Sequence, residues 1–221
     1  MPAAKSKESI NMQNSKCKIC RRLGVKLFLK GERCLLQKCP MVRRPYLPGA
    51  KKKRRGKMLS EYGKELREKQ KLKNLYNLRE AQFRKYVKEV LSFRGKTEED
   101  VSNLLVKVLE SRLDNVIFRL GMVSSRTQAR QLVSHNHFLV NGKSVNIPSY
   151  RVKKGDIIKI KPRSLKKNIF QNLSLKLSKQ KIPSWLALDI KNLEIKITGE
   201  PSIEEVALPV EIPVIFEYYS R

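Results

Sequence analysis

The fold is decided by residues 111–160, which read SRLDNVIFRLGMVSSRTQARQLVSHNHFLVNGKSVNIPSYRVKKGDIIKI. From Leu113 to Leu120 the apolar residues recur at spacings of three and four, which places them on one face of a helix. Gly121 follows, and glycine enters the left-handed conformation that ends a helix at no steric cost. We therefore expect a short amphipathic helix over residues 111–120.

A second helix is predicted directly after the first. Ser125 can accept a hydrogen bond from a free backbone N–H, and Gln128, three positions on, can reach back in the manner of a capping box. Arg126 and Arg130, four residues apart, share a stripe along the edge of the apolar arc. Because the first turn of a helix already favours anions, two guanidinium groups there indicate a phosphate ligand.

The rest of the stretch predicts a small β-unit. An apolar strand over residues 138–140 leads into Asn141-Gly142, the strongest short hairpin signal, and residues 145–147 would pair back. A further strand is predicted over residues 157–160. Two helices followed by short strands indicate a small α+β unit.

Length and charge bound the function of the whole chain. The 221 residues allow two or three small domains, and 49 Lys and Arg against 20 Asp and Glu give a formal net charge of +29. Such a charge repels itself unless a polyanion neutralises it, and nucleic acid is the commonest polyanion. No apolar run is long enough for a membrane helix and the N-terminus does not resemble a signal peptide. We expect a cytoplasmic protein with no membrane partner.

All four cysteines lie in one short segment, as Cys17-x2-Cys20 and Cys34-x4-Cys39. In a reducing cytosol, paired cysteines at such spacings more often bind zinc than form disulfides, since four thiolates close a tetrahedral shell. An iron–sulfur cluster or free thiols are the alternatives. With four protein ligands the metal has no open position for a substrate, so its role would be structural.

A proline-punctuated basic segment, residues 40–57, follows the cysteines and contains no acidic residue. The prolines favour extended or turn conformations, so we expect a basic strap along a nucleic-acid groove. A solvated linker is the alternative.

Helices and strands complete the chain. Residues 60–93 are rich in helix formers and predict two helices, and Thr97 with Asp100 would cap a third that carries Val101 to Val108. Residues 163–181 are basic and either weakly structured or helical. Residues 193–197 alternate as a half-buried strand does, and residues 214–221 predict a last strand.

The organising stretch resembles the S4 RNA-binding domain, through Ser-Arg-Leu-Asp-Asn, Arg-Leu-Gly, Ser-Arg-Thr-Gln-Ala-Arg-Gln-Leu-Val and Val-Asn-Gly-Lys in that order. Cys-Lys-Ile-Cys-Arg-Arg, Lys-Gly-Glu-Arg-Cys, Arg-Arg-Pro-Tyr, Leu-Ser-Glu-Tyr-Gly and the final Tyr-Ser-Arg extend the resemblance to the bacterial-type small-subunit ribosomal protein S4 family, in its four-cysteine form. The chain departs from the family at Asn136, where glycine is usual, and at residues 47–53, which lack a Gln-His-Gly step.

The resemblance implies an α+β fold with three parts. These are a basic N-terminal region with a four-cysteine metal knuckle (residues 1–45), a mainly helical discontinuous domain (46–110, completed by 178–221) and an inserted S4 RNA-binding domain (111–177). It implies a ribosomal protein that binds the 5′ domain of small-subunit rRNA, nucleates assembly and contributes to decoding accuracy where the mRNA enters. Ribosomal protein S5 would be a neighbour, mRNA a further contact, translational autorepression a further role, and no homo-oligomer is expected.

The predicted RNA contacts are the basic and polar residues of the cysteine region, the strap and the S4-like stretch. They are Arg21, Arg22, Arg43, Arg44, Lys51, Lys52, Lys53, Arg54, Arg55, Arg112, Ser125, Arg126, Gln128, Arg130, Gln131, Asn141, Lys143 and Arg151; the predicted metal ligands are Cys17, Cys20, Cys34 and Cys39.

Two other functional classes fit parts of the sequence. An RNA-modifying enzyme could carry an S4-like domain, and Arg112-Leu113-Asp114 imitates a catalytic motif of pseudouridine synthases. However, only sixty residues follow Lys161, and neither histidine has an obvious nucleophile partner. A DNA-binding regulator fits the helix-turn-helix spacing, but the charge is spread over every segment and no dimerisation element is evident. We therefore expect an RNA-binding structural protein and no catalytic residues.

Overall fold

The computed structural model describes residues 16–49, 58–93, 100–171, 173, 177, 180, 182–189 and 193–220. The chain divides into two compact units, which we call the terminal unit (Met1–Glu80 with Val210–Arg221) and the central unit (Ala81–Pro209). This division by contacts differs from the domain boundaries expected at residues 45, 110 and 177, which stay a prediction. Each unit is described by itself below.

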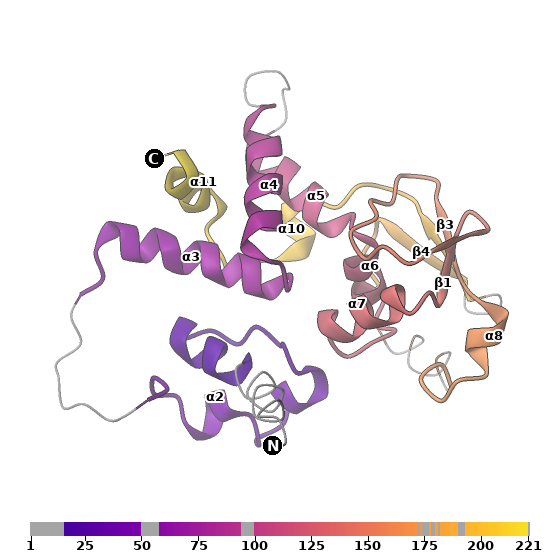
Figure 1. Cartoon of the computed structure of the whole chain (residues 1–221), viewed down its shortest axis with the longest axis horizontal. Helices are drawn as coiled ribbons and strands as arrows, with labels where there is room; N and C mark the ends of the chain where they lie inside the picture. Colours follow the sequence, from indigo (N-terminus) through magenta and orange to yellow (C-terminus); the bar gives the residue numbers. More distant parts are fainter. Residues whose placement is uncertain are drawn as a thin grey trace, which may run out of the picture. The chain divides into compact units, whose positions relative to one another are not determined.

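The terminal unit is helical in its described part (Figure 1). A helical stretch at residues 16–23 precedes the 3-10 helix η1 (Gly31–Cys34), α2 (Pro40–Arg43), α3 (Glu61–Leu75) and α11 (Ile212–Ser220). Ser60 begins α3, because its hydroxyl accepts a hydrogen bond of 3.2 Å from the backbone N–H of Gly63. The last helix, α11, packs on α3, so the end of the chain returns to the first long helix.

The strand predicted over residues 214–221 was wrong, because α11 occupies residues 214–220. The valine, isoleucine and aromatic residues that favour a strand here also suit a helix when one face is buried. Ile212 and Ile215, three residues apart, are buried, which is a helical spacing. Packing on α3 therefore outweighs the β propensity of the segment.

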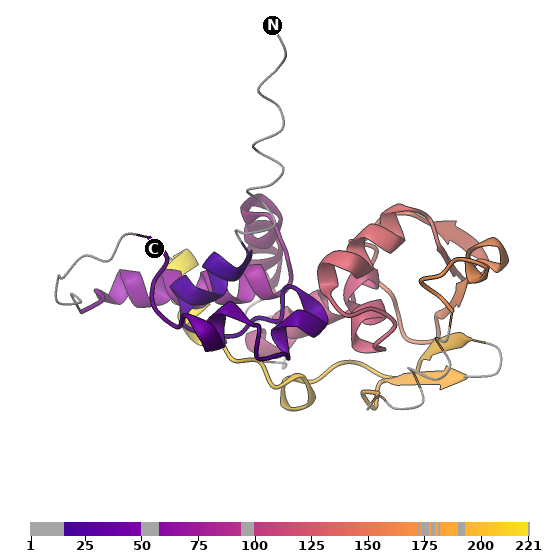
Figure 2. The same ribbon diagram turned by 90° about the horizontal axis from the view of Figure 1, so that it is seen from below.

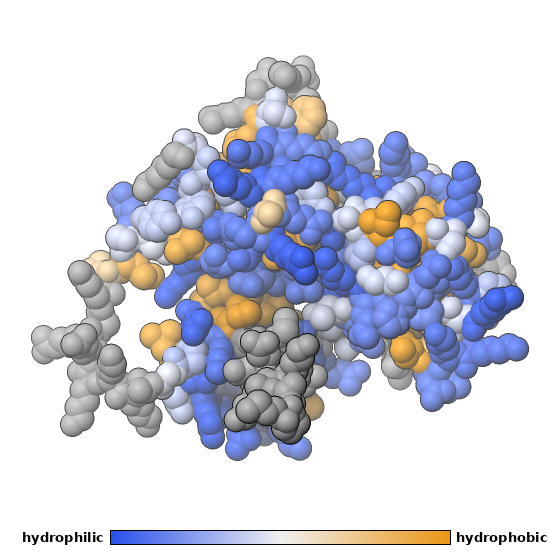
Figure 3. All heavy atoms as spheres, viewed as in Figure 1, coloured by the Kyte–Doolittle hydropathy of each residue, from blue (hydrophilic) through white to orange (hydrophobic). Residues whose placement is uncertain are grey.

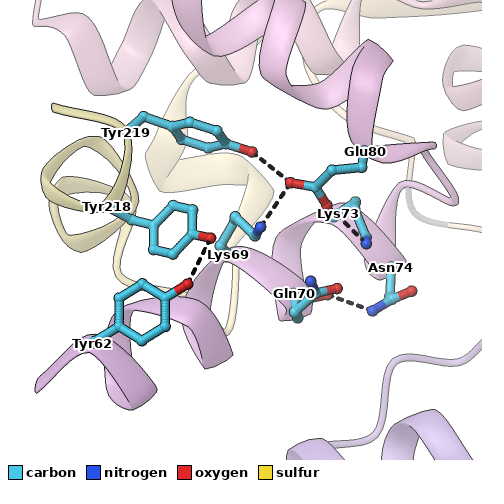
Figure 4. A network of polar contacts seen from close by, with 8 residues as sticks. All are labelled: Tyr62, Lys69, Gln70, Lys73, Asn74, Glu80, Tyr218 and Tyr219. Atoms are coloured by element: carbon cyan, nitrogen blue, oxygen red, sulfur yellow. Dashed lines mark hydrogen bonds and ion pairs between the residues drawn. The ribbon is translucent and has the colours of Figure 1, made fainter. Parts of the chain in front are cut away.

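A polar network joins α11 to α3 and to Glu80 (Figure 4). Lys69 is buried at 4% exposure, and its ammonium group lies 2.7 Å from the Glu80 carboxylate and 4.4 Å from the ring centre of Tyr218. The Tyr219 hydroxyl donates to the same carboxylate over 3.0 Å, and the hydroxyls of Tyr62 and Tyr218 share a hydrogen bond. The two tyrosines of α11 thus anchor the helix through polar as well as apolar contacts.

The central unit begins with helices α4 (Glu80–Leu91) and α5 (Val101–Glu110). The Asp100 carboxylate caps α5 by accepting from the N–H of Ser102 over 3.1 Å, while Thr97 lies outside the described residues. The helices predicted over residues 60–93 are confirmed as α3 and α4. In the central unit, α5 is followed by α6 (Leu113–Arg119), α7 (Arg126–Ser134), α8 (Pro162–Leu165) and α10 (Ile203–Val206).

The strands of the central unit form one five-stranded antiparallel sheet in the order β2-β1-β3-β5-β4. Its strands are β1 (Phe138–Val140), β2 (Lys143–Val145), β3 (Ile157–Ile160), β4 (Leu186–Asp189) and β5 (Glu194–Ile197). Figure 2 shows β4 and β5, in gold, side by side. Strands β4 and β5 therefore extend the sheet of the S4-like stretch.

The predicted hairpin is confirmed, with a shifted second strand. Asn141 and Gly142 both have positive φ, 49° and 77°, which is the conformation of a two-residue type I′ turn. Such a short turn makes pairing resume at once, so Val140 faces Lys143 and Phe138 faces Val145. Residues 143–145 pair back in place of residues 145–147.

One apolar core joins α6, α7 and the sheet. Leu113 and Ile117 of α6, Val133 of α7 and Phe138 of β1 are all fully buried in it. Trp185 is buried in the same core at 3% exposure. Asn136, with φ at 62°, ends α7, and the N–H of His137 donates to the carbonyl of Leu132. In Figure 1, α6 and α7 lie side by side next to this sheet.

Membrane spans were searched among the described residues. None of the helices there combines the length and the apolar character that crossing a bilayer requires.

The Glu80 network predicts acid-sensitive stability of the terminal unit. Burial alone would raise the pKa of Glu80, but hydrogen bonds from Lys69, Lys73 and Tyr219 outweigh it and lower the pKa from 4.5 to about 2. A lowered pKa stabilises the folded state above about pH 4.5, and this contribution is lost as the pH falls through about 2. We expect Glu80→Gln to unfold at a lower temperature than the parent at pH 7, and the gap to close between these two pH values.

Thermal unfolding followed by circular dichroism at a series of pH values measures this gap. Glu217→Gln, which removes an exposed carboxylate from α11, is the matched control and should track the parent throughout. A gap between parent and Glu80→Gln that stays constant down to pH 2.5 would contradict the assignment.

Candidate nucleic-acid interface

The basic residues of the N-terminal region divide into exposed and anchored side chains. Arg22, Arg43 and Arg44 are exposed. Arg21 is half-buried, donates from Nε to the carbonyl of Tyr46 over 2.8 Å and lies 4.8 Å from the centre of that ring. The predicted contacts Lys51, Lys52, Lys53, Arg54 and Arg55 lie outside the described residues.

The four cysteines are free thiols gathered in the same region. Cys20, Cys34 and Cys39 are buried, and Cys17 is half-buried. Burial raises the pKa of the Cys20 and Cys34 thiols, the other cysteines add to the rise, and N–H groups of Leu27 and Lys30 oppose it. By its chemistry the donor set suits a soft metal, since thiolates are soft ligands and backbone N–H groups donate to two of the sulfur atoms. In the described part of the chain, no three His, Cys, Asp or Glu side chains are arranged closely enough to hold a metal.

The N-terminal end of α7 is capped as predicted, with one difference. The hydroxyl of Ser125 accepts from the N–H of Gln128 over 3.4 Å. The Gln128 side chain, however, accepts from the N–H and the hydroxyl of Ser124, at 3.3 and 3.1 Å. The reciprocal bond of the predicted capping box therefore reaches one residue further back than Ser125.

Arg126, the first residue of α7, is half-buried and held by α6. Its Nε donates to the side-chain oxygen of Asn115 over 2.8 Å, and its guanidinium carbon lies 4.3 Å from the ring centre of Phe118. Arg130, one turn later, is also half-buried, and Gln131 is exposed. The predicted basic stripe of α7 therefore exists, and Arg126 is fixed in place by contacts with α6.

Two of the predicted contacts on the β-unit hold the loops together. The side-chain oxygen of Asn141 accepts from the N–H of Ile157 over 2.9 Å, and its amide nitrogen donates to Asp156 over 2.8 Å. Arg151 forms two bonds of 2.6 Å to the Glu89 carboxylate, and these bonds lower the pKa of Glu89. Lys143, by contrast, is exposed on β2.

Arg112 departs most from its predicted role, because its side chain is buried at 1% exposure. It makes two bonds to the Asp114 carboxylate, at 3.0 and 2.6 Å, and donates to the hydroxyl of Tyr86 over 2.6 Å. Because the Arg112 guanidinium is buried and bonded to Asp114 and Tyr86, it does not face an RNA ligand. Asp114 is the ion-pair partner that keeps the Arg112 side chain buried.

The surface around these elements is strongly polar. On the face seen in Figure 3, hydrophilic residues predominate and apolar residues gather in small separate patches. Exposed cations outside the predicted set include Lys153, Lys154, Arg163, Lys166 and Lys167. Together with Arg22, Arg43, Arg44 and Lys143 they provide cations for phosphate groups.

Comparison with known proteins places these features in a family. The profile described as "Ribosomal protein S4/S9 N-terminal domain" matches residues 11–106, and that of the "S4 domain" matches residues 111–158. The protein of Caldicellulosiruptor bescii described as small ribosomal subunit protein uS4 is 48% identical over 205 residues, covering 93% of this chain and 96% of the relative. The chain belongs to the uS4 family.

Proteins of the same description from Thermotoga maritima and Thermus thermophilus are each 44% identical, over 206 and 205 residues, and again cover 93% of this chain and 96% of the relative. The S4 domain match begins at Ser111 and ends within β3, so it contains α6, α7 and the hairpin. The resemblance to the ribosomal S4 family is thereby confirmed.

The sequence did not predict one buried polar group of the uS4 chain. Glu110, Asn115 and Arg119 form a buried to half-buried polar group between α5 and α6. The sequence does contain a signal, because Asn115 and Arg119 are four residues apart and flank the apolar run Val116-Ile117-Phe118 of a short helix. Polar residues beside such an apolar run predict a buried partner, although they do not say which one.

Burial of Arg112 predicts that its loss costs stability. Arg112→Ala leaves the Asp114 carboxylate buried without its counter-ion, so we expect the free energy of unfolding to fall by about 3–5 kcal/mol. Lys153→Ala removes an exposed cation from the same unit and should change it by no more than about 0.5 kcal/mol.

Urea unfolding followed by the fluorescence of Trp185, the only tryptophan of the chain, measures both variants. If Arg112→Ala is as stable as Lys153→Ala, Arg112 does not have the core role assigned to it.

Proposed function

We propose that this chain is a structural protein of the small ribosomal subunit that binds the 5′ domain of small-subunit rRNA. The observation that carries the proposal is the match of nearly the whole chain to uS4 proteins, together with a net charge of +29. A charge of this size requires a polyanion, and an S4 domain with a fixed arginine on α7 supplies a rigid cationic surface.

The binding mode is recognition of RNA shape and phosphate spacing. Aromatic residues make up only 7% of the chain, which supplies few platforms for base stacking. Rigid elements that carry many cations suit a helix junction, where phosphates of several strands converge. In this proposal Arg22, Arg43, Arg44, Arg126, Arg130, Gln131 and Lys143 are contacts, whereas Arg112 stabilises the fold.

The finer roles follow from the family. The chain nucleates assembly of the 5′ domain, lies beside ribosomal protein S5 where the mRNA enters, and contributes to decoding accuracy. It also represses translation of its own mRNA by binding a fold similar to its rRNA site. These roles need the same rRNA-binding surface, so the binding experiment below is their common test.

The structural metal in this proposal is zinc, held by Cys17, Cys20, Cys34 and Cys39. It would join the helical stretch at residues 16–23, which carries Cys17 and Cys20, to η1 and the start of α2, which carry Cys34 and Cys39. An iron–sulfur cluster is the alternative ligand of the same thiols. Bound zinc stabilises the N-terminal region because the unfolded chain has no preformed site.

Metal analysis tests the zinc assignment. We expect about one zinc per chain in protein purified without added metal. The zinc content of Cys34→Ser should be less than half as much, because the tetrahedral shell needs all four thiolates. Lys38→Ala, beside Cys39 but without a thiol, should keep full zinc content. Iron and sulfide in place of zinc, or no metal in parent and variants alike, would contradict the proposal.

RNA titration tests the main function. We expect the double variant Arg126→Ala, Arg130→Ala to bind a transcript of the rRNA 5′ domain more weakly. The slope of log K against log salt should fall by about one to two, because fewer counterions are released. The double variant Lys85→Ala, Lys88→Ala removes the same charge from exposed positions of α4 and should change the slope less.

A slope that is the same in the parent and in Arg126→Ala, Arg130→Ala would overturn the assignment of α7 to the interface. The same titration with the leader transcript of the protein's own mRNA examines autorepression. Binding to that leader no tighter than to unrelated RNA would exclude it.

A further inference from the structure

The carboxylate of Glu110 lies at the end of α5 and is fully buried. It accepts hydrogen bonds from the Asn115 amide over 2.6 Å, and from Nε and Nη2 of Arg119 over 2.9 and 2.7 Å. A buried carboxylate that lost these donors would be costly, so the three side chains hold one another in a fixed arrangement.

This arrangement fixes the direction of the Asn115 amide, which is itself buried at 1% exposure. An ionised carboxylate only accepts hydrogen bonds, so the nitrogen end of the amide must face Glu110. The oxygen end then faces the opposite way. A flip of the amide would set oxygen against oxygen at Glu110, which excludes the alternative orientation.

The oxygen end of Asn115 receives the Nε–H of Arg126 over 2.8 Å. The ring of Phe118, one turn further along α6, supports the guanidinium from its face at 4.3 Å. The long, flexible side chain of Arg126 is thus held by Asn115 at one edge of its guanidinium group and by Phe118 on one face of it. The bond to Asn115 uses Nε–H, one of the five N–H donors of the group.

We propose that Asn115 is a positioning residue for RNA binding, which orients the Arg126 guanidinium toward an RNA phosphate. The inference rests on the proposed function, because it takes Arg126 as an RNA contact and assigns the orientation of its guanidinium group to the buried Asn115. Glu110 orients Asn115, Asn115 orients Arg126, and Phe118 keeps the guanidinium plane in place. The arginine then reaches the phosphate without losing further rotamer freedom, which increases affinity.

The geometry and the charge of the Arg126 side chain contribute separately to RNA affinity. Lysine at position 126 keeps the positive charge but has no planar group to accept support from Phe118 and no Nε–H in the arginine position. Arg126→Lys should therefore recover little of the affinity that Arg126→Ala loses. If only the charge of Arg126 contributed to binding, Arg126→Lys would recover the lost affinity in full.

A double-mutant cycle tests the proposal, with a transcript of the rRNA 5′ domain as the probe. We expect Asn115→Ala to bind about five- to tenfold more weakly than the parent, since one hydrogen bond to a charged group is lost. In the presence of Arg126→Ala, the same substitution should have no further effect. Losses that multiply in the double variant would overturn the proposal.

A matched control separates positioning from loss of stability. Val116→Ala creates a cavity at a fully buried position of the same helix, outside the Glu110 network, and should leave RNA affinity unchanged at temperatures where it is folded. If Val116→Ala weakens binding as much as Asn115→Ala, the effect is structural and the proposal fails.

A second cycle uses Phe118→Leu, which is the readout if Asn115→Ala does not fold. It keeps an apolar side chain but removes the ring face, so we expect about two- to fivefold weaker binding, only when Arg126 is present. If Phe118→Leu weakens binding equally without Arg126, the proposal is overturned.

The RNA contact of Arg126 and the positioning role of Asn115 can be tested separately. Unchanged RNA binding in Arg126→Ala would remove the interface itself and the inference with it. Weaker binding in Arg126→Ala combined with an independent effect of Asn115→Ala would remove only the positioning role.

Discussion

Two buried carboxylates, Glu110 and Asp114, are the constraint on which the central unit depends. Each is nearly or fully excluded from solvent, and each is neutralised by an arginine two to nine residues away, Arg112 for Asp114 and Arg119 for Glu110. A buried charge is tolerated only with its donors in place. The end of α5 and the whole of α6 must therefore adopt the one arrangement in which both carboxylates are satisfied.

The arginine side chains of this very basic chain differ in their contacts and therefore in their roles. Arg112 is confined to the core, Arg151 is paired with Glu89, and Arg126 is supported at its edge by Asn115. The same residue type thus serves as core ion, loop anchor and fixed surface cation. In a protein whose charge already ensures attraction to a polyanion, fixed positions are what can add selectivity for one RNA over another.

Much of the central unit was predictable because its signals are local. The spacing in α6, the Ser125 cap of α7 and the Asn141-Gly142 turn depend on residues a few positions apart, and all three are present. The last helix was missed because its residues have high β propensity, and only its packing on α3 makes it helical. Arg112 was misassigned because burial of an arginine depends on partners such as Tyr86, twenty-six residues away.

Competition for the purified protein at physiological salt shows whether its cations recognise one RNA or any polyanion. The 5′-domain fragment of small-subunit rRNA would compete with double-stranded DNA and with an unrelated structured RNA of equal length. We expect the rRNA fragment to bind about a thousandfold or more tightly than either competitor, because fixed cations match one arrangement of phosphates. Equal competition by all three would show that the charge of +29 acts only as a nonspecific grip on polyanions.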